Sequence, residues 1–199
     1  AAAFLMGNIG ASELAAHTVA LQIAALAFQV PFGVGQAATI RVGYFYGARD
    51  EGGIRRAGWT AIVVGTGFMV LTALAMVVIP KPLIAIYVDP WDPKNAVLVG
   101  FALQYIVIAA AFQLFDGMQA VAAGALRGLQ DTRIPMWIAA FAYWVPGIGT
   151  ALVLGFATPL EGTGVWIGLA TGLTFAAALL GWRWHRREAL GLTLRPASR

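Results

Sequence analysis

The stretch YIVIAAAFQLFDGMQAVAAGAL, residues 105–126, decides what class of protein this chain belongs to. As an α-helix it is long enough to cross the hydrocarbon core of a bilayer, which is about 30 Å thick. One charged residue, Asp116, interrupts this apolar run. A carboxylate near the middle of a membrane helix costs about 2.5–3.5 kcal/mol on insertion scales, so such residues face a bundle interior, a cavity or an ion path.

Asp116 is therefore the first candidate functional residue, and two roles fit it. The carboxyl group could form a structural hydrogen bond with a neighbouring helix. Alternatively, it could bind a proton or a sodium ion and change partners when it is neutralised. The cost of placing the charge in a membrane favours the second role. We expect a cation-coupling site at Asp116, with Gln113 close by.

Similar apolar stretches recur along the whole chain. The sequence is 60% hydrophobic and 11% charged, with a mean hydropathy of +0.77, whereas a soluble domain has about 25% charged residues. We predict an all-α membrane protein with full spans at residues 13–48, 54–79, 96–126, 135–156 and 164–184. The opening AAAFLMGNIGAS is interpreted as the second half of one more helix. Residues 1–187 should form a transmembrane lobe and residues 188–199 a basic tail.

The basic residues predict how the spans are oriented. If the spans alternate in direction, all the arginines fall at one end of the bundle and only Lys81 and Lys94 at the other. Such an excess marks the cytoplasmic side of membrane proteins. We therefore expect a multi-pass protein of the plasma (inner) membrane, in contact with membrane lipid, with a cytoplasmic C-terminus. A nucleic-acid partner is not expected, because the arginines are scattered at helix ends. Aromatic belts are expected at both membrane interfaces, with Trp59, Trp137, Trp182 and Trp184 at the inner one and Trp91 and Trp166 at the outer one.

Several polar and aromatic residues inside the spans are tentative parts of a substrate cavity. Gln22, Gln29 and Gln36 recur every seven residues and so return to nearly the same face of a helix. Amides on one face can line an aqueous cavity or join helices by hydrogen bonds, and both alternatives stay open. Pro31 should kink this helix. His17, near the outer end of the same span, is either a structural residue or part of the cavity.

Two features of the last spans are predicted from the sequence alone. Tyr143 lies deep in the fourth span, just before a break expected at residues 145–147, and could form an aromatic wall for organic cations or simply pack. Gly164, Gly168 and Gly172 recur every four residues, a spacing that permits close helix contact.

Catalysis is not expected. The only serines, Ser12 and Ser198, lie outside the predicted spans, and the chain contains no cysteine and only two histidines. A phosphate-binding glycine loop with a lysine is also missing from the sequence. We expect neither an enzyme nor a cofactor, and no metal site apart from sodium that could bind at Asp116.

The order of several motifs adds a resemblance to a known family. The segments ELAAHTVALQIAALAFQVPFGVGQAATIRVGYFYGA, IRRAGWTA, FQLFDGMQAVAAGALRGLQDTRIPMW, AYWVPG and GVWIGLATGLTFAAALL resemble the C-terminal half of a multidrug and toxic compound extrusion (MATE) transporter. The resemblance implies a twelve-helix fold of two six-helix lobes, here the second half of helix 7 and helices 8 to 12. It also implies an antiporter that expels amphipathic, mostly cationic organic compounds in exchange for protons or sodium, with a missing N-terminal lobe as partner.

The resemblance also assigns residues. Asp116 matches the helix 10 acid of the family's cation site, and the helix 7 glutamate that usually accompanies it would precede Ala1. Phe28 and Phe112 lie where some members carry a tyrosine. Because neither phenylalanine supplies an oxygen to ligate sodium, the resemblance favours protons as the coupling ion. The segment around Arg127, Asp131 and Arg133 matches a cytoplasmic turn and is expected to be structural. The alternatives are a flippase for lipid-linked precursors, for which cationic cavity residues are expected, and a non-transporting membrane scaffold.

Overall fold

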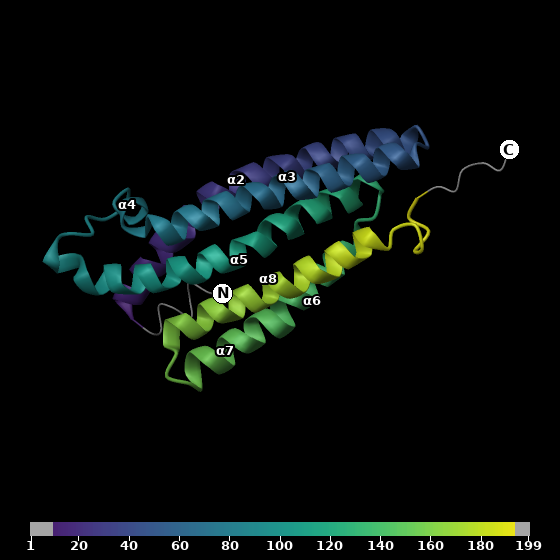
Figure 1. Ribbon diagram of the computed structural model, residues 1–199. Coiled ribbons are helices and arrows are strands. Elements are labelled where there is room, and N and C mark those ends of the chain that lie inside the picture. The colour runs from purple at the N-terminus through teal and green to yellow at the C-terminus, as the bar shows by residue number, and fades with distance from the viewer. Residues whose placement is uncertain (1–9, 194–199) are drawn as a thin grey trace.

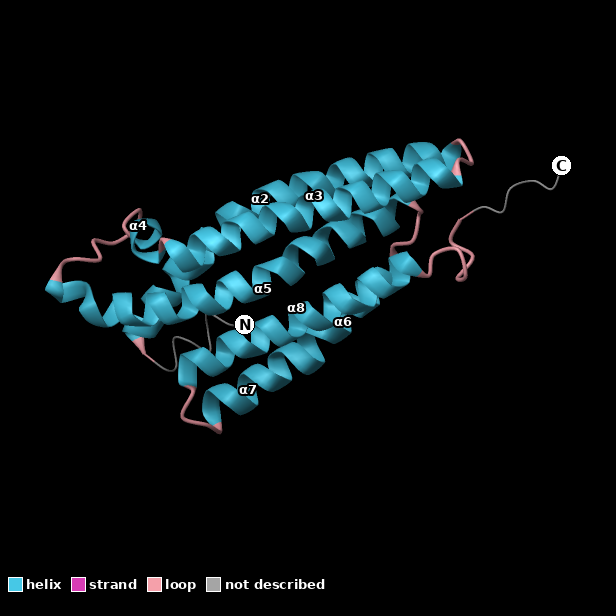
Figure 2. Ribbon diagram, in the orientation of Figure 1, coloured by secondary structure: helices cyan, strands magenta, loops and turns pink. Residues whose placement is uncertain are grey.

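The long apolar segments form helices that run side by side as one bundle (Figure 1). The structure is a computed structural model that describes residues 10–193. Within that range all regular structure is helical, and five segments are long and apolar enough to cross a membrane (Figure 2). The helices are α2 (Ala11–Gly47), α3 (Glu51–Val78), α4 (Pro80–Ile84), α5 (Ala96–Gly128), α6 (Arg133–Ala142), α7 (Gly149–Phe156) and α8 (Glu161–His185), with short helices η1 (Pro93–Asn95) and η2 (Tyr143–Ile148).

These bounds confirm the five predicted spans, each within three residues of the expected boundary. Residues 1–9 of the predicted half-helix lie outside the described residues, and so do residues 194–199 of the predicted tail. Residues 81–95, between the second and third spans, contain most of α4 and all of η1.

The two prolines inside the spans have different effects on their helices. Pro31 is buried in α2, which stays helical through it, and Figure 1 shows α2 bending along its course. Pro146 lies in η2, a single π-helical turn at the predicted break. A proline has no N–H to donate and crowds the preceding turn, and a wider turn accommodates it. The fourth span therefore continues as α6, η2 and α7 instead of breaking.

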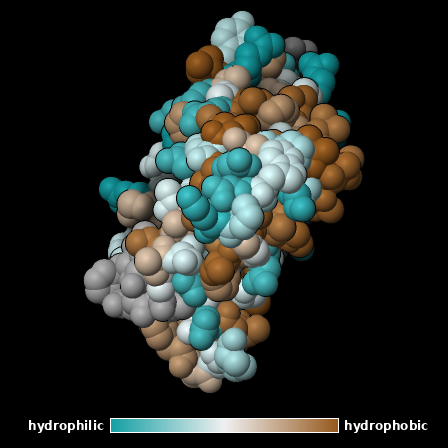
Figure 3. All heavy atoms as spheres, turned by 90° about the vertical axis from the view of Figure 1, so that its left-hand side faces the viewer, coloured by the Kyte–Doolittle hydropathy of each residue, from teal (hydrophilic) through white to brown (hydrophobic). Residues whose placement is uncertain are grey.

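The two ends of the bundle differ in charge. The α2–α3 turn, the α5–α6 turn and the last residue of α8 lie at one end, and the α3–α5 connection and the α7–α8 turn lie at the other (Figure 1). The predicted clustering of arginines at one end therefore agrees with the arrangement of the helices. Figure 3 views the opposite end, where hydrophilic residues gather over the loops and hydrophobic residues cover the flank.

The core has an aromatic centre near the α3–α5 connection. Trp166 of α8 stacks on Tyr105 and Phe112 of α5, with ring centroids 5.9 and 5.4 Å apart, and His17 of α2 meets it edge-on at 5.3 Å. Trp166 and Trp184 are fully buried. Both lie near the ends of α8, as the predicted belts require, but their rings fill space between helices, whereas Trp91, Trp137 and Trp182 are exposed.

Close helix contacts depend on small residues. A Cβ added at Gly164 or Gly168 of α8 would collide with the backbone of Leu154 or Ala151, and one at Gly172 would lie 3.0 Å from the carbonyl oxygen of Ala142. The predicted packing role of this glycine ladder is confirmed. Gly124 of α5 similarly lies against the backbone of Gly35 of α2.

Candidate functional site

Asp116 lies on the side of α5 that borders a cavity of about 270 Å³. The side chain is half-buried, and α2, α5 and η2 form the walls. The other residues that line this cavity, called here the Asp116 cavity, are Phe28, Phe32, Gly35, Gln36, Gln119, Ala120, Ala123, Arg127 and Tyr143. The structure thus brings together Asp116, Phe28 and Tyr143 of the predicted site.

The geometry of α5 explains which of its residues reach the cavity. Asp116, Gln119, Ala123 and Arg127 are spaced by three or four residues, so they lie on one face of the helix. At 1.5 Å per residue Arg127 is about 16 Å further along the helix than Asp116. Within residues 10–193 the Asp116 carboxylate has neither a hydrogen-bond donor nor an ion-pair partner. Its oxygens are therefore free to bind a ligand.

A second cavity, of about 290 Å³, continues the first toward the arginine-rich end. The two cavities share Gln119, Ala123 and Arg127, and the second one also borders Asp131 at the α5–α6 turn. Asp131 accepts a hydrogen bond from Nε of Arg183 at 2.6 Å, which ties this turn to the end of α8. The structural role predicted for Asp131 is confirmed, whereas Arg127 also borders both cavities.

Gln113, predicted to lie beside Asp116 in the cation site, has different partners. Its Nε2 donates to the carbonyl oxygen of Met69 at 3.2 Å and to Oγ1 of Thr72 at 2.9 Å, both on α3. Three residues correspond to a rotation of about 300°, so Gln113 and Gln119 lie about 60° to either side of Asp116, and only the Gln119 side faces the cavity. In this packing the Gln113 amide joins two helices and does not line the Asp116 cavity.

The remaining predicted cavity residues are dispersed. Phe112 is buried against Trp166, and the His17 side chain is buried beside the same ring. Gln22 and Gln29 are exposed, and among the three glutamines of the α2 stripe only Gln36 borders the Asp116 cavity.

Sequence reasoning missed Gln119 and Phe32. A signal for both was present, because Gln119 follows Asp116 by three residues and Phe32 follows Phe28 by four, on the same helix faces. The rings of Phe28 and Phe32 lie 6.1 Å apart.

The chemistry of the site is that of one unpaired carboxylate beside aromatic rings and amides. Over residues 10–193 no group of three or more His, Cys, Asp or Glu side chains is close enough to hold a metal ion. One carboxylate can accept a proton, help to ligate a monovalent cation, or pair with an organic cation whose apolar part contacts the rings.

Comparison with known proteins decides the family. The sequence matches the MatE family over residues 1–153. The chain belongs to the MatE family. This confirms the resemblance seen in the sequence motifs, and with it the prediction of a multi-pass membrane protein that is not an enzyme.

Relatives of this MatE chain extend the comparison. The probable multidrug resistance protein NorM of Mesorhizobium japonicum is 50% identical over 190 residues, which are 96% of this chain and 41% of that protein. The multidrug resistance protein NorM of Burkholderia vietnamiensis is 46% identical over 184 residues, 92% of this chain and 40% of that protein. The chain thus spans about two fifths of the length of these relatives.

A solved structure supports the fold. The crystal structure of the eukaryotic MATE transporter AtDTX14 superposes with a TM-score of 0.76 at 23% sequence identity, covering 92% of this chain and 41% of that chain. The described helices therefore adopt the fold of one part of a two-lobed MATE transporter.

Proposed function

We propose that this chain forms the C-terminal lobe of a secondary multidrug exporter. The exporter would expel amphipathic, mostly cationic organic compounds in exchange for protons or sodium, with Asp116 as the coupling carboxylate. The observation that carries this proposal is the carboxylate of Asp116, which has no ion-pair partner among residues 10–193 and borders a cavity inside the membrane-spanning segments. The names of the NorM relatives favour an exporter over a flippase or a scaffold.

The cavity walls suit an organic cation. Phe28, Phe32 and Tyr143 offer ring faces, which attract cations within about 6 Å, and Gln36 and Gln119 offer amides that can bind polar groups. A proton or sodium ion at Asp116 removes the negative charge that would hold such a compound. The two cations therefore compete for one carboxylate, and this competition links the entry of one to the release of the other.

Exchange also requires two conformations of the lobes. A ligand shifts a conformational equilibrium only by the difference between its affinities for the two states. We propose that neutralising Asp116 provides this difference, through a changed set of partners for the carboxyl group. A glutamate on helix 7 and an N-terminal lobe are the partners expected upstream. In this arrangement Gln113 fixes α5 against α3, and the C-terminus faces the cytoplasm.

The test is the substitution Asp116→Asn in the full-length protein, reconstituted in liposomes. We expect efflux of a fluorescent organic cation, driven by a proton or sodium gradient, to fall about tenfold or more, because the amide takes up no proton and lacks the negative charge that attracts sodium. Asp116→Glu, which keeps a carboxylate, should retain part of the activity. Expression and monodispersity of both variants are the control for folding. Transport by Asp116→Asn at the normal rate would refute the proposal.

A further inference from the structure

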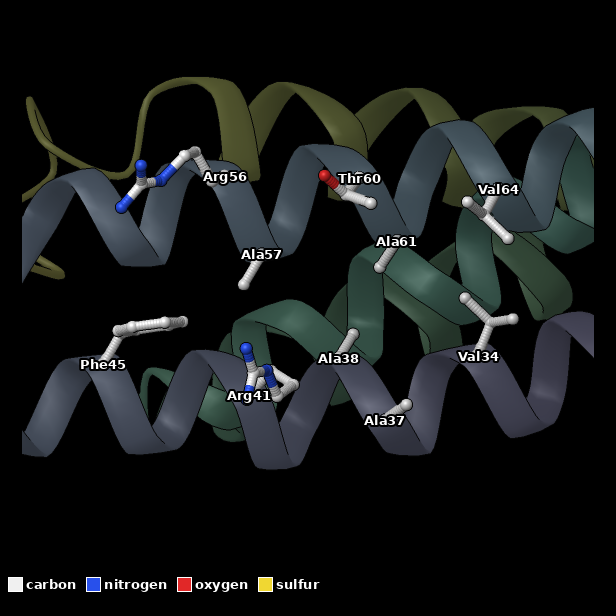
Figure 4. Close-up of a pocket in the computed structure, with 10 residues that line it drawn as sticks. All are labelled: Val34, Ala37, Ala38, Arg41, Phe45, Arg56, Ala57, Thr60, Ala61 and Val64. Carbon is white, nitrogen blue, oxygen red and sulfur yellow. The ribbon is translucent and has the colours of Figure 1, made fainter.

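A groove of about 500 Å³ runs between α2 and α3, and its lining differs from that of the Asp116 cavity. Small residues form its inner surface, with Ala38 on α2 and Ala57 and Ala61 on α3 facing one another (Figure 4). The Phe45 ring reaches into the same space from α2. Because these side chains are short, the two helices leave the groove open between them.

The groove has an apolar end and a charged end. Val34 and Val64 line the deep end, whereas Arg41 and Arg56 line the end nearer the α2–α3 turn. At 1.5 Å per residue the valines lie about 10–12 Å deeper than the arginines along their helices. The arginines in turn lie within about 9 Å of the helix ends Gly47 and Glu51. In a membrane this places the guanidinium groups near the headgroups and the valines in the hydrocarbon.

Among residues 10–193, no carboxylate neutralises the two arginines of the groove. Within residues 10–193 neither Arg41 nor Arg56 forms an ion pair with a carboxylate. The guanidinium carbon of Arg41 lies 5.4 Å from the centre of the Phe45 ring, and Arg56 is exposed and extends along α3 (Figure 4). Asp50, the nearby acid, caps α3 by accepting a hydrogen bond from the backbone N–H of Gly53 at 2.9 Å.

We propose that this groove binds an anionic phospholipid. One acyl chain lies along the alanines toward Val34 and Val64, and the phosphate lies between Arg41 and Arg56, within reach of the Thr60 hydroxyl. Charge complementarity selects this occupant, because a phosphate accepts the charge-assisted hydrogen bonds that guanidinium groups donate. A second protein lobe with an apolar surface fits less well, since it would bury two unpaired charges. The proposal is independent of the role proposed for Asp116.

The experiment uses native mass spectrometry of the full-length protein, with phosphatidylglycerol and phosphatidylcholine of equal chain length added separately. We expect the protein to retain phosphatidylglycerol in preference to phosphatidylcholine. The double variant Arg41→Gln/Arg56→Gln should weaken the binding of phosphatidylglycerol about 25-fold, since each arginine loses a hydrogen bond to the phosphate that contributes about a factor of five. Both arginines are exposed, so the protein should fold normally.

Arg55→Gln is the matched control, because Arg55 is the exposed neighbour of Arg56 and does not line the groove. It should leave lipid binding unchanged. Ala61→Phe should fill the groove and weaken binding while both arginines remain. The proposal is overturned if Arg55→Gln weakens binding as much as the double variant, or if Ala61→Phe has no effect. It is equally overturned if inorganic phosphate displaces the lipid or if the protein shows no preference between the lipids.

Discussion

The two sides of α5 differ in what their polar and small residues contact. On the packed side, Gln113 donates two hydrogen bonds to α3, and Gly124 lies against the backbone of α2. On the open side, Asp116, Gln119 and Ala123 border a cavity. Gln113 and Asp116 are three residues apart, yet the first is held by helix packing and the second is free to bind a ligand. The different roles of Gln113 and Asp116 follow from the directions in which their side chains point.

The side chains on the two sides of α5 also differ in their contribution to stability. A hydrogen bond between membrane helices contributes about 0.6 kcal/mol on average, so Gln113 gives a modest gain in stability. Placing the Asp116 carboxylate in the membrane costs about 2.5–3.5 kcal/mol. Within residues 10–193, no ion pair offsets this cost. Departures from the rules of stable packing are expected at functional sites. This contrast is why the open side is the candidate site.

The largest difference between the two sides should come from adding bulk at neighbouring positions. Gly124→Leu would force a side chain into the backbone of Gly35, and we expect it to lower the free energy of unfolding by about 3 kcal/mol or more. Ala123→Leu adds similar bulk one residue away, where the side chain borders both cavities, and should change stability by under about 1 kcal/mol. Thermal unfolding followed by size-exclusion chromatography in detergent measures both. Equal losses of stability would mean that the sides do not differ.

The fold could be predicted from the sequence because its signals are local. Apolar length set the spans, the turn residues set their ends, and the proline at position 146 marked the irregular turn in the fourth span. The family motifs then supplied the order of the helices. Predicting the spans and their order does not require knowing which helix faces contact one another.

The site could be predicted only in part, because lipid is as apolar as a protein core. In a soluble helix a stripe of apolar residues marks the buried face, but lipid-facing residues of a membrane helix are apolar too, so the pattern is lost. The sequence therefore identified Asp116 by its cost and could not tell that Gln113 and Phe112 point elsewhere. The burial of Trp166 and Trp184 could not be predicted for the same reason, since a ring that faces lipid and a ring that faces a neighbouring helix look alike in sequence.

A medium-sized effect is expected at Gln119, on the open side of α5. Gln119→Leu removes an amide from the cavity wall, where Gln119 lies close to Tyr143, so stability should fall by no more than the value of one neutral hydrogen bond. If the amide binds polar groups of the transported compound, affinity should fall about two- to tenfold, the range of one neutral hydrogen bond. The apparent Kd of a fluorescent organic cation for the full-length protein checks this. An unchanged Kd would place the compound outside the Asp116 cavity.

The smallest effect is expected at Gln113, on the packed side. Gln113→Leu removes two hydrogen bonds to α3, but Oγ1 of Thr72 still donates to the carbonyl oxygens of Phe68 and Met69 within its own helix. The buried Oε1 of Gln113, which has no hydrogen-bond partner among the described residues, disappears with the substitution and offsets part of the loss. We therefore expect a decrease of about 0.6 kcal/mol in stability, with the Kd for the organic cation unchanged. A Kd shift as large as that of Gln119→Leu would show that both sides of α5 serve the site, because a residue that only joins α5 to α3 cannot select among ligands.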